Sequence, residues 1–216
     1  MSNLEVYFKN HDKALRFPWS IYHRPLIDDL DLFLKTHLRA GMKVLVIGPG
    51  DFQEFELLEK KSAVVSILDI DLRVLDLHQK RYGHRIEKYF AVDSDFNGYP
   101  MDEEYDFVYA KEVIEHIVEY EKFLKAINKI LKPGGHIWLS TPNYGYFLLP
   151  LLESTVLEVF ARFSGFSRKH IHPTRLSRSS LFDAIVKIGL EKCIVKETFL
   201  RLALVAHAKK REDSEI

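Results

Sequence analysis

Cysteine is nearly absent from the chain, since Cys193 is the only one among 216 residues. A single cysteine excludes an intrachain disulfide and any metal cluster that needs two thiolates, and it fits a reducing compartment. No apolar run reaches the roughly 18 residues that span a bilayer, and the first residues lack the basic-then-apolar order of a signal peptide. We therefore expect a cytoplasmic protein without a transmembrane segment.

An excess of charge is missing as well, because 31 Lys and Arg residues balance 31 Asp and Glu residues. Without a net field, the composition disfavours nucleic acid or an anionic membrane as the main partner. The length suits a single domain over 1–216 with a large buried core. These features leave a small-molecule or lipid-like substrate as the expected partner.

The most informative stretch that is present is 43–52, where an apolar run ends abruptly in glycine. Residues 44–47 are all apolar, as in a central parallel strand that is buried on both faces. Gly48 and Gly50 then allow a tight turn and a close approach of the backbone to a ligand. The stretch fits either the opening of a nucleotide-binding domain or an ordinary strand-to-helix turn.

The rest of the chain alternates between strand and helix patterns. The periodicity predicts helices over 4–15, 21–38, 119–131 and 179–188, and strands over 44–47, 64–68, 89–92, 105–110 and 136–140. Such alternation is typical of an α/β fold, a doubly wound parallel sheet with helices on both faces. Ligands of these sheets bind at the carboxyl ends of the strands.

Acidic residues stand at two of those strand ends. Asp69 follows the second strand roughly 20 residues after the glycine turn, where a carboxylate can accept hydrogen bonds from ribose hydroxyls. Asp93 closes the third strand, where a side chain can meet an adenine edge. Asp71 is better placed to cap the following helix than to bind ribose.

At this point the motifs resemble a known family. The segments VLVIGPG (44–50), LDID (68–71), VDS (92–94), YDFV (105–108), EVIEHI (112–117), LKPGG (131–135) and STPN (140–143) look like class I S-adenosylmethionine-dependent methyltransferases, nearest to the ubiquinone-biosynthesis O-methyltransferase-like branch. The resemblance implies a Rossmann-like, seven-stranded, mostly parallel sheet with an antiparallel last strand. It divides the chain into N-terminal helices (1–40), a cofactor-binding core (41–143), a lid or helical insert after strand five (144–178), and a closing helix with the last two strands (179–209).

The resemblance also implies a cofactor, S-adenosylmethionine, and residues to hold it. Gly48, Pro49 and Gly50 would lie under its methionine part, and Asp69 would bind the ribose. Ile70 and Ser94 would border the adenine, and Asp93 would accept a hydrogen bond from the exocyclic amine of that ring. Lys111 and Glu112 would begin the segment beside the sulfonium. Two departures stand out: Val46 replaces the family's usual acidic residue, and Phe52 replaces a usual third glycine. Either change would weaken cofactor binding or mark a fold that has lost its activity.

Candidate catalytic and metal-binding residues lie in two segments. If 112–117 is helical, Glu112, Glu115 and His116 project from one face, and His170 and His172 follow later. In the resembled ubiquinone O-methyltransferases, and in small-RNA 2′-O-methyltransferases, such a motif with a later histidine binds a divalent metal beside the acceptor hydroxyl. The metal set would be Glu112, Glu115, His116 and His170, with His172 as the other histidine that could reach it. The alternative is that glutamates at a helix start only favour the helix dipole, and catalysis would then fall to Glu112, Glu115, His116 or His172.

Two further segments carry open interpretations. The apolar insert 144–166 fits a lid over an apolar acceptor, the surface of a homodimer, or packing on the domain, and the last two are favoured. The segment 17–24 mixes aromatic residues with Arg24 and fits a cleft wall or, better, an ordinary aromatic cluster.

The expected function is methyl transfer from S-adenosylmethionine to a small or lipid-like acceptor, at oxygen rather than at nitrogen or carbon. The alternative from another class is a non-catalytic binding module that kept the fold. A nicotinamide dehydrogenase is disfavoured, because the chain lacks both a Tyr-x-x-x-Lys pair and a Gly-x-Gly-x-x-Gly loop.

Overall fold

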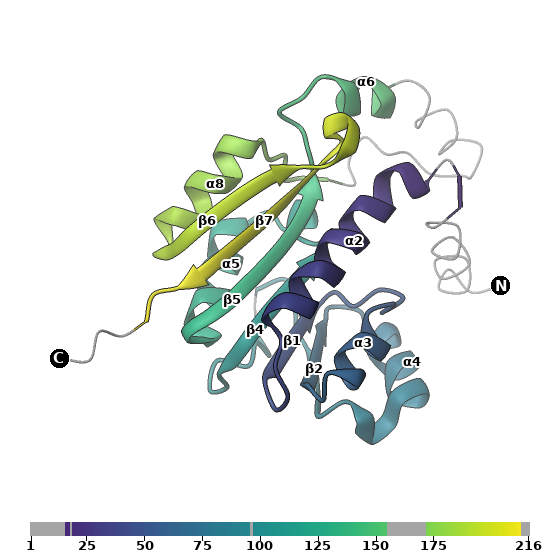
Figure 1. The fold of residues 1–216 in the computed structure, drawn as a ribbon, viewed down its shortest axis with the longest axis vertical. Coiled ribbons are helices and arrows are strands. Elements are labelled where there is room, and N and C mark those ends of the chain that lie inside the picture. The colour runs from purple at the N-terminus through teal and green to yellow at the C-terminus, as the bar shows by residue number, and fades with distance from the viewer. Residues whose placement is uncertain (1–15, 18, 96, 155–171, 213–216) are drawn as a thin grey trace.

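A computed structural model of the chain describes residues 16–17, 19–95, 97–154 and 172–212. Over these residues, seven strands form one sheet in the order β3-β2-β1-β4-β5-β7-β6 (Figure 1). The strands are β1 (Lys43–Ile47), β2 (Val64–Asp69), β3 (Lys88–Ala91), β4 (Tyr105–Lys111), β5 (Leu131–Pro142), β6 (Leu190–Glu197) and β7 (Ala203–Lys210). The expected doubly wound, seven-stranded sheet is confirmed.

Strand β1 lies between β2 and β4 and pairs with both in parallel. Val46 stands opposite Ile67 on one side and Tyr109 on the other. The chain adds β2 and β3 on one side of β1 and then returns to add β4 on the other, so the strand order reverses between β1 and β4. This reversal is where ligands of such sheets bind. Strand β7 runs antiparallel to β5 and β6, as expected for the last strand.

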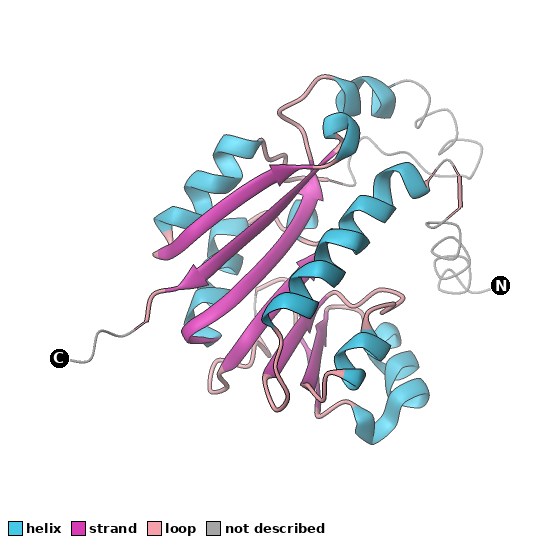
Figure 2. Cartoon of the chain, in the orientation of Figure 1, coloured by secondary structure: helices cyan, strands magenta, loops and turns pink. Residues whose placement is uncertain are grey.

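Helices cover both faces of the sheet (Figures 1 and 2). They are α2 (Ser20–His37), α3 (Phe55–Lys60), α4 (Leu72–Tyr82), α5 (Tyr120–Ile130), α6 (Leu148–Ser154) and α8 (Arg178–Lys187). Val44 and Val46 of β1 enter the core shared with α2, α3 and α4, whereas Leu45 and Ile47 enter the core shared with α5 and α8. Alternate strand residues face opposite sides, so both faces are buried and the run is apolar throughout. None of the described helices has the length and apolar character needed to cross a bilayer.

Helix α2 is anchored to strands β5, β6 and β7 through Asp29. Its carboxylate accepts from Trp138 Nε1 at 3.0 Å and from Lys196 Nζ at 3.1 Å, and His207 Nε2 lies 2.6 Å away. Burial opposes ionisation, but these hydrogen bonds outweigh it and lower the pKa of Asp29. The anchor fixes α2, so that Tyr22 on its first turn reaches the carboxyl ends of β4 and β5.

Two local features differ from the sequence interpretation, and two predicted segments lie wholly or partly outside the described residues. Strand β5 begins at Leu131 rather than 136, because residues 132–135 bulge between two paired positions, Tyr105 with Leu131 and Phe107 with His136. The segment 112–117 is not a helix: only the 3₁₀ turn η2 (Ile114–His116) forms, and Glu112 has a left-handed φ of 58°. The predicted helix over 4–15 and residues 155–171 of the insert are outside the described part of the chain.

Candidate active site

The glycine turn after β1 is built differently at its two glycines. Gly48 has a φ of 62°, and a Cβ there would stand 2.6 Å from Val113 Cγ2, so glycine is required by both backbone and packing. Gly50 has a φ of 55°, but a Cβ there would meet nothing within 4 Å. The carbonyl of Gly50 is held 2.9 Å from Nε2 of the buried His78 on α4. The turn is therefore held in place by His78, and the space beside the Gly50 Cα is open.

Asp69 ends β2 beside this turn. Its Oδ1 accepts from the Asp71 amide at 2.8 Å, which fixes the carboxylate at the strand end. Partial burial raises the pKa of Asp69, although the amide hydrogen bond opposes the rise. The neighbouring Ile70 leaves 65% of its side chain exposed. Asp71 caps α4 by accepting from the Arg73 amide at 2.9 Å, as expected.

Asp93 follows β3 and is exposed. Its Oδ1 accepts from the amides of Asp95 and Asn97, both at 2.9 Å, and its Oδ2 accepts from Asn97 Nδ2 at 2.8 Å. These hydrogen bonds lower the pKa of Asp93. The carboxylate therefore organises its own loop, and Ser94 lies exposed within that loop.

Glu112 follows β4 and has partners from distant elements. The Tyr22 hydroxyl donates to Oε2, and Ser140 Oγ donates to Oε1 at 3.0 Å. The Glu112 amide in turn donates to Ser140 O at 3.2 Å. Burial raises the pKa of Glu112 to about 7, against the lowering effect of the Tyr22 and Ser140 hydrogen bonds and of the Lys111 charge. The carboxylate is thus held between α2 and β5.

Glu115, His116 and His172 form a second cluster. One ligand atom from each of the three lies within 4.8 Å of the others. Thr141 Oγ1 donates to Glu115 Oε2 at 3.1 Å, and burial, followed by the charge of Glu112, raises the pKa of Glu115. His172 is brought in because the Thr174 amide donates to the Glu115 carbonyl at 3.1 Å. Its Nδ1 lies 2.5 Å from the Tyr144 hydroxyl.

This geometry changes the metal set expected from the sequence. Because Glu112 is left-handed and bound to Tyr22 and Ser140, it does not share a helical face with Glu115 and His116. Within the described residues the convergent donors are Glu115, His116 and His172. His170 lies outside those residues.

Phe52, at the position of the usual third glycine, turns its bulk away from the glycine turn. It has a φ of 53°, is 1% exposed, and its ring packs edge-on against Phe55, His78 and Tyr82 at centroid distances of 5.4, 5.7 and 5.8 Å. The substitution fills the core beneath the turn.

Sequence reasoning missed three residues around these clusters: Ser140, Thr141 and Tyr144. Ser140 and Thr141 carried a usable signal, since two hydroxyl residues end an otherwise apolar strand. Tyr22 was included in the aromatic segment 17–24, for which an ordinary cluster was favoured, but it reaches Glu112. Nothing in the sequence connects positions 22 and 112.

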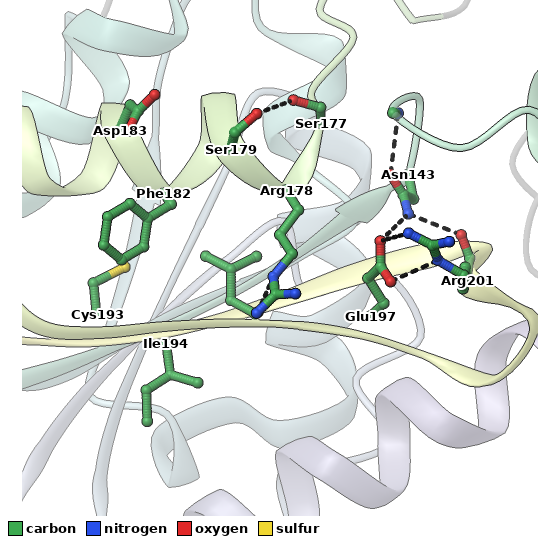
Figure 3. Close-up of a pocket in the computed structure, with 12 residues that line it drawn as sticks. Asn143, Ser177, Arg178, Ser179, Phe182, Asp183, Cys193, Ile194, Glu197 and Arg201 are labelled. Carbon is green, nitrogen blue, oxygen red and sulfur yellow. Dashed lines mark hydrogen bonds and ion pairs between the residues drawn. The ribbon is translucent and has the colours of Figure 1, made fainter.

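A cavity of about 640 Å³ lies elsewhere, between α8 and β6 (Figure 3). Asn143, Arg178, Phe182 and Arg201 are among its lining residues. Arg178 and Arg201 are already engaged, with the Val195 carbonyl at 3.0 Å and with Glu197 at 2.7 Å. None of the residues expected from the sequence to bind cofactor or metal lines this cavity.

Comparison with known proteins gives a consistent family. The model of a methyltransferase domain family matches residues 19–193. A ubiquinone biosynthesis O-methyltransferase from Pseudomonas entomophila (strain L48) is 29% identical over 143 residues, which are 63% of this chain and 61% of the relative. The chain thus spans about 61% of the length of that relative.

Solved structures agree on the fold. A SAM-dependent methyltransferase from Aquifex aeolicus superposes with a TM-score of 0.64 at 15% identity, covering 97% of this chain and 99% of its own. The CurJ carbon methyltransferase superposes with a TM-score of 0.68 at 14% identity, covering 98% of this chain and 62% of its own. Because CurJ is named as a carbon methyltransferase and the Pseudomonas relative as an O-methyltransferase, the fold alone does not assign the acceptor.

Proposed function

The chain belongs to the methyltransferase domain family, and from this premise we propose that it transfers a methyl group from S-adenosylmethionine to a hydroxyl of a small or lipid-like acceptor. The observation that carries the proposal is the meeting of two sets of groups at the reversal of strand order. The glycine turn and Asp69 stand on one side of it, and Glu112, Glu115, His116 and His172 stand on the other.

The residues on the cofactor side fit S-adenosylmethionine. The open space over Gly50 leaves the backbone accessible to a ligand. Asp69 offers a carboxylate fixed at the strand end for ribose hydroxyls, and the exposed Ile70 offers an apolar surface for adenine. Asp93 and Ser94 would contact the adenine edge from a loop that Asp93 already organises.

The acceptor side is suited to removing a proton from a hydroxyl. The sulfonium of the cofactor supplies a methyl group with an excellent leaving group, so the protein has to align the acceptor and take up its proton. Glu112 is held by Tyr22 and Ser140 next to the end of β4, and its pKa of about 7 suits a general base near neutral pH. This arrangement favours oxygen over carbon as the acceptor atom.

The donor set beside Glu112 fits a divalent metal. Glu115, His116 and His172 offer one carboxylate and two imidazoles within 4.8 Å of one another, and such a mixed set suits zinc, manganese or iron. A divalent cation there would lower the pKa of an acceptor hydroxyl and orient it. Thr141 and Tyr144 would orient the ligating side chains of Glu115 and His172. Glu112 would remain outside this set as the base.

Thermal unfolding in the presence of S-adenosylhomocysteine tests the proposal. A ligand that binds only the folded state stabilises it, and at about 100 times Kd the melting temperature should rise by about 5–10 °C. Asp69→Ala should remove most of this rise, whereas Asp76→Ala, an exposed aspartate of α4, should retain it. An unchanged rise in Asp69→Ala would mean that the ribose is held elsewhere.

The alternative is a binding module without activity, and only one of the two departures from the family pattern still supports it. Phe52 packs into the core and leaves the turn open, so the remaining argument is the missing carboxylate at Val46. A protein whose melting temperature responds to neither S-adenosylmethionine nor S-adenosylhomocysteine would favour the module.

A further inference from the structure

The neighbours of Val46 show where the missing strand carboxylate would lie. Val46 stands opposite Tyr109 in the pairing of β1 with β4. Side chains two residues apart on a strand share a face, so Lys111 lies on the same face as Tyr109, one step closer to the glycine turn. A carboxylate at position 46 would belong to this group of neighbours.

A buried carboxylate reaches the same group from another element. Glu54 directly precedes α3 and is 2% exposed, and it forms an ion pair with Lys111 Nζ. Glu54 is the N-cap residue of α3, but its side chain makes no capping hydrogen bond. Its carboxylate is therefore directed into the protein and away from the helix amides that such a residue normally satisfies.

The surroundings of the pair are polar and incompletely satisfied. The Tyr109 hydroxyl is buried and has no hydrogen-bond partner among the described residues. Tyr109 shares a buried core with Phe55, the residue that follows Glu54. Burial, followed by the charge of Glu54, raises the pKa of Tyr109. A buried ion pair with an unpartnered hydroxyl beside it is costly for a purely structural contact, so a ligand that completes it offers a reason for its presence.

We propose that Glu54 and Lys111 bind the amino-acid end of the cofactor, with Glu54 in place of the strand carboxylate that Val46 lacks. This inference rests on the proposed function. The amino-acid end carries an ammonium and a carboxylate, and the pair offers the opposite charge to each. Glu54 accepts hydrogen bonds from the ammonium and Lys111 donates to the carboxylate. Lys111 neutralises Glu54 when no ligand is bound.

Two ligands that differ only at this end test the inference. S-adenosylhomocysteine carries the amino acid, whereas 5′-deoxy-5′-methylthioadenosine keeps the adenosine and sulfur but lacks it. Calorimetric titration of Glu54→Gln should show a roughly ten- to hundredfold loss of affinity for S-adenosylhomocysteine. Its affinity for methylthioadenosine should stay within about twofold of wild type, because the adenosine contacts are untouched. Glu56→Gln, an exposed glutamate of the same helix, should bind both ligands like wild type.

The outcomes separate the inference from its premise. Equal losses for both ligands in Glu54→Gln, or no loss for either, would overturn the assignment of Glu54. A wild-type protein that binds neither ligand would instead overturn the proposed function. Because removing one buried charge can unfold a protein, the double variant Glu54→Gln/Lys111→Gln, which leaves no unpaired charge, should be titrated as well. It should reproduce the selective loss at an unchanged melting temperature.

Discussion

The two sides of the candidate site satisfy their carboxylates in opposite ways. Beyond β2 and β3, Asp69 and Asp93 accept hydrogen bonds from residues two to four positions away, and Asp93 remains exposed. Beyond β4, Glu112 and Glu115 are bound by Tyr22, Ser140 and Thr141, which lie 26 to 90 positions away. The cofactor side is assembled locally, whereas the acceptor side depends on the whole fold.

This difference has an electrostatic consequence. Hydrogen bonds from the Asn97 side chain and from the Asn97 and Asp95 amides lower the pKa of Asp93, so that it stays ionised, whereas partial burial raises the pKa of Asp69. Burial raises the pKa of Glu112 and Glu115, and the charge of Glu112 adds to the rise at Glu115. Asp93 therefore suits a permanent hydrogen-bond acceptor, whereas Glu112 and Glu115 suit groups that exchange a proton or gain a cation. The two sides should therefore respond to different perturbations.

The largest effect is expected at the metal cluster. His172→Ala removes one of three convergent donors, and the affinity for Mn²⁺ or Zn²⁺ should fall roughly a hundredfold or more in calorimetric titration. The affinity for S-adenosylhomocysteine should not change, because the cofactor residues lie on the other side. His84→Ala, an exposed histidine, serves as the control. Equal metal binding by His172→Ala and wild type would rule out His172 as a ligand.

The next effect is the pH dependence of cofactor binding. Asp69 must be ionised to accept from ribose hydroxyls, and its pKa is raised, so affinity is fully present above that pKa and is lost as pH falls through it. Below the pKa we expect about a tenfold loss per pH unit. Asp69→Asn should bind weakly and without this dependence. Parallel pH profiles for the variant and wild type would assign the titration to another group.

A smaller effect is expected from the long-range contact at Glu112. Tyr22→Phe removes a donor that lowers the pKa of Glu112, so that pKa should rise further, by an amount worth about 1 kcal/mol. Carboxyl carbon NMR titration measures the change directly. The control is Tyr89→Phe on the edge strand β3. The Tyr89 hydroxyl donates to the Gly83 carbonyl at 2.8 Å, so its removal should leave the pKa of Glu112 unchanged. A fall of the pKa in Tyr22→Phe would contradict the assigned contact.

The smallest effect concerns a cap on the cofactor side. Asp71→Ala removes the N-cap of α4 and should lower the free energy of unfolding by about 1 kcal/mol in urea denaturation. Affinity for S-adenosylhomocysteine should remain close to wild type, because the amide that binds Asp69 belongs to the backbone. A lost affinity at unchanged stability would make Asp71 a ribose ligand instead.

The local character of the proposed cofactor side also explains why its structural elements could be predicted from the sequence. The apolar run of β1, its glycines, Asp69 and the cap at Asp71 each act within a few residues, so their spacing carries the information. The α/β class and the family resemblance followed from the same local signals. The match of the methyltransferase domain family over residues 19–193 confirms that resemblance.

The acceptor side could not be predicted in the same way. The shared helical face considered for 112–117 does not form, because Glu112 takes a left-handed conformation, in which its amide bonds Ser140 and its carboxylate reaches Tyr22. These contacts join α2, β4 and β5, and no spacing in the sequence encodes them. Glu54 was overlooked for the same reason, since its partner Lys111 is 57 positions away.

The structure of the protein crystallised with S-adenosylhomocysteine tests the central claim most directly. The account predicts ribose hydroxyls within hydrogen-bond distance of the Asp69 carboxylate, the amino-acid end beside Glu54 and Lys111, and the sulfur facing Glu112. A ligand bound in the cavity between α8 and β6, or one bound at the glycine turn with its ribose away from Asp69, would contradict it.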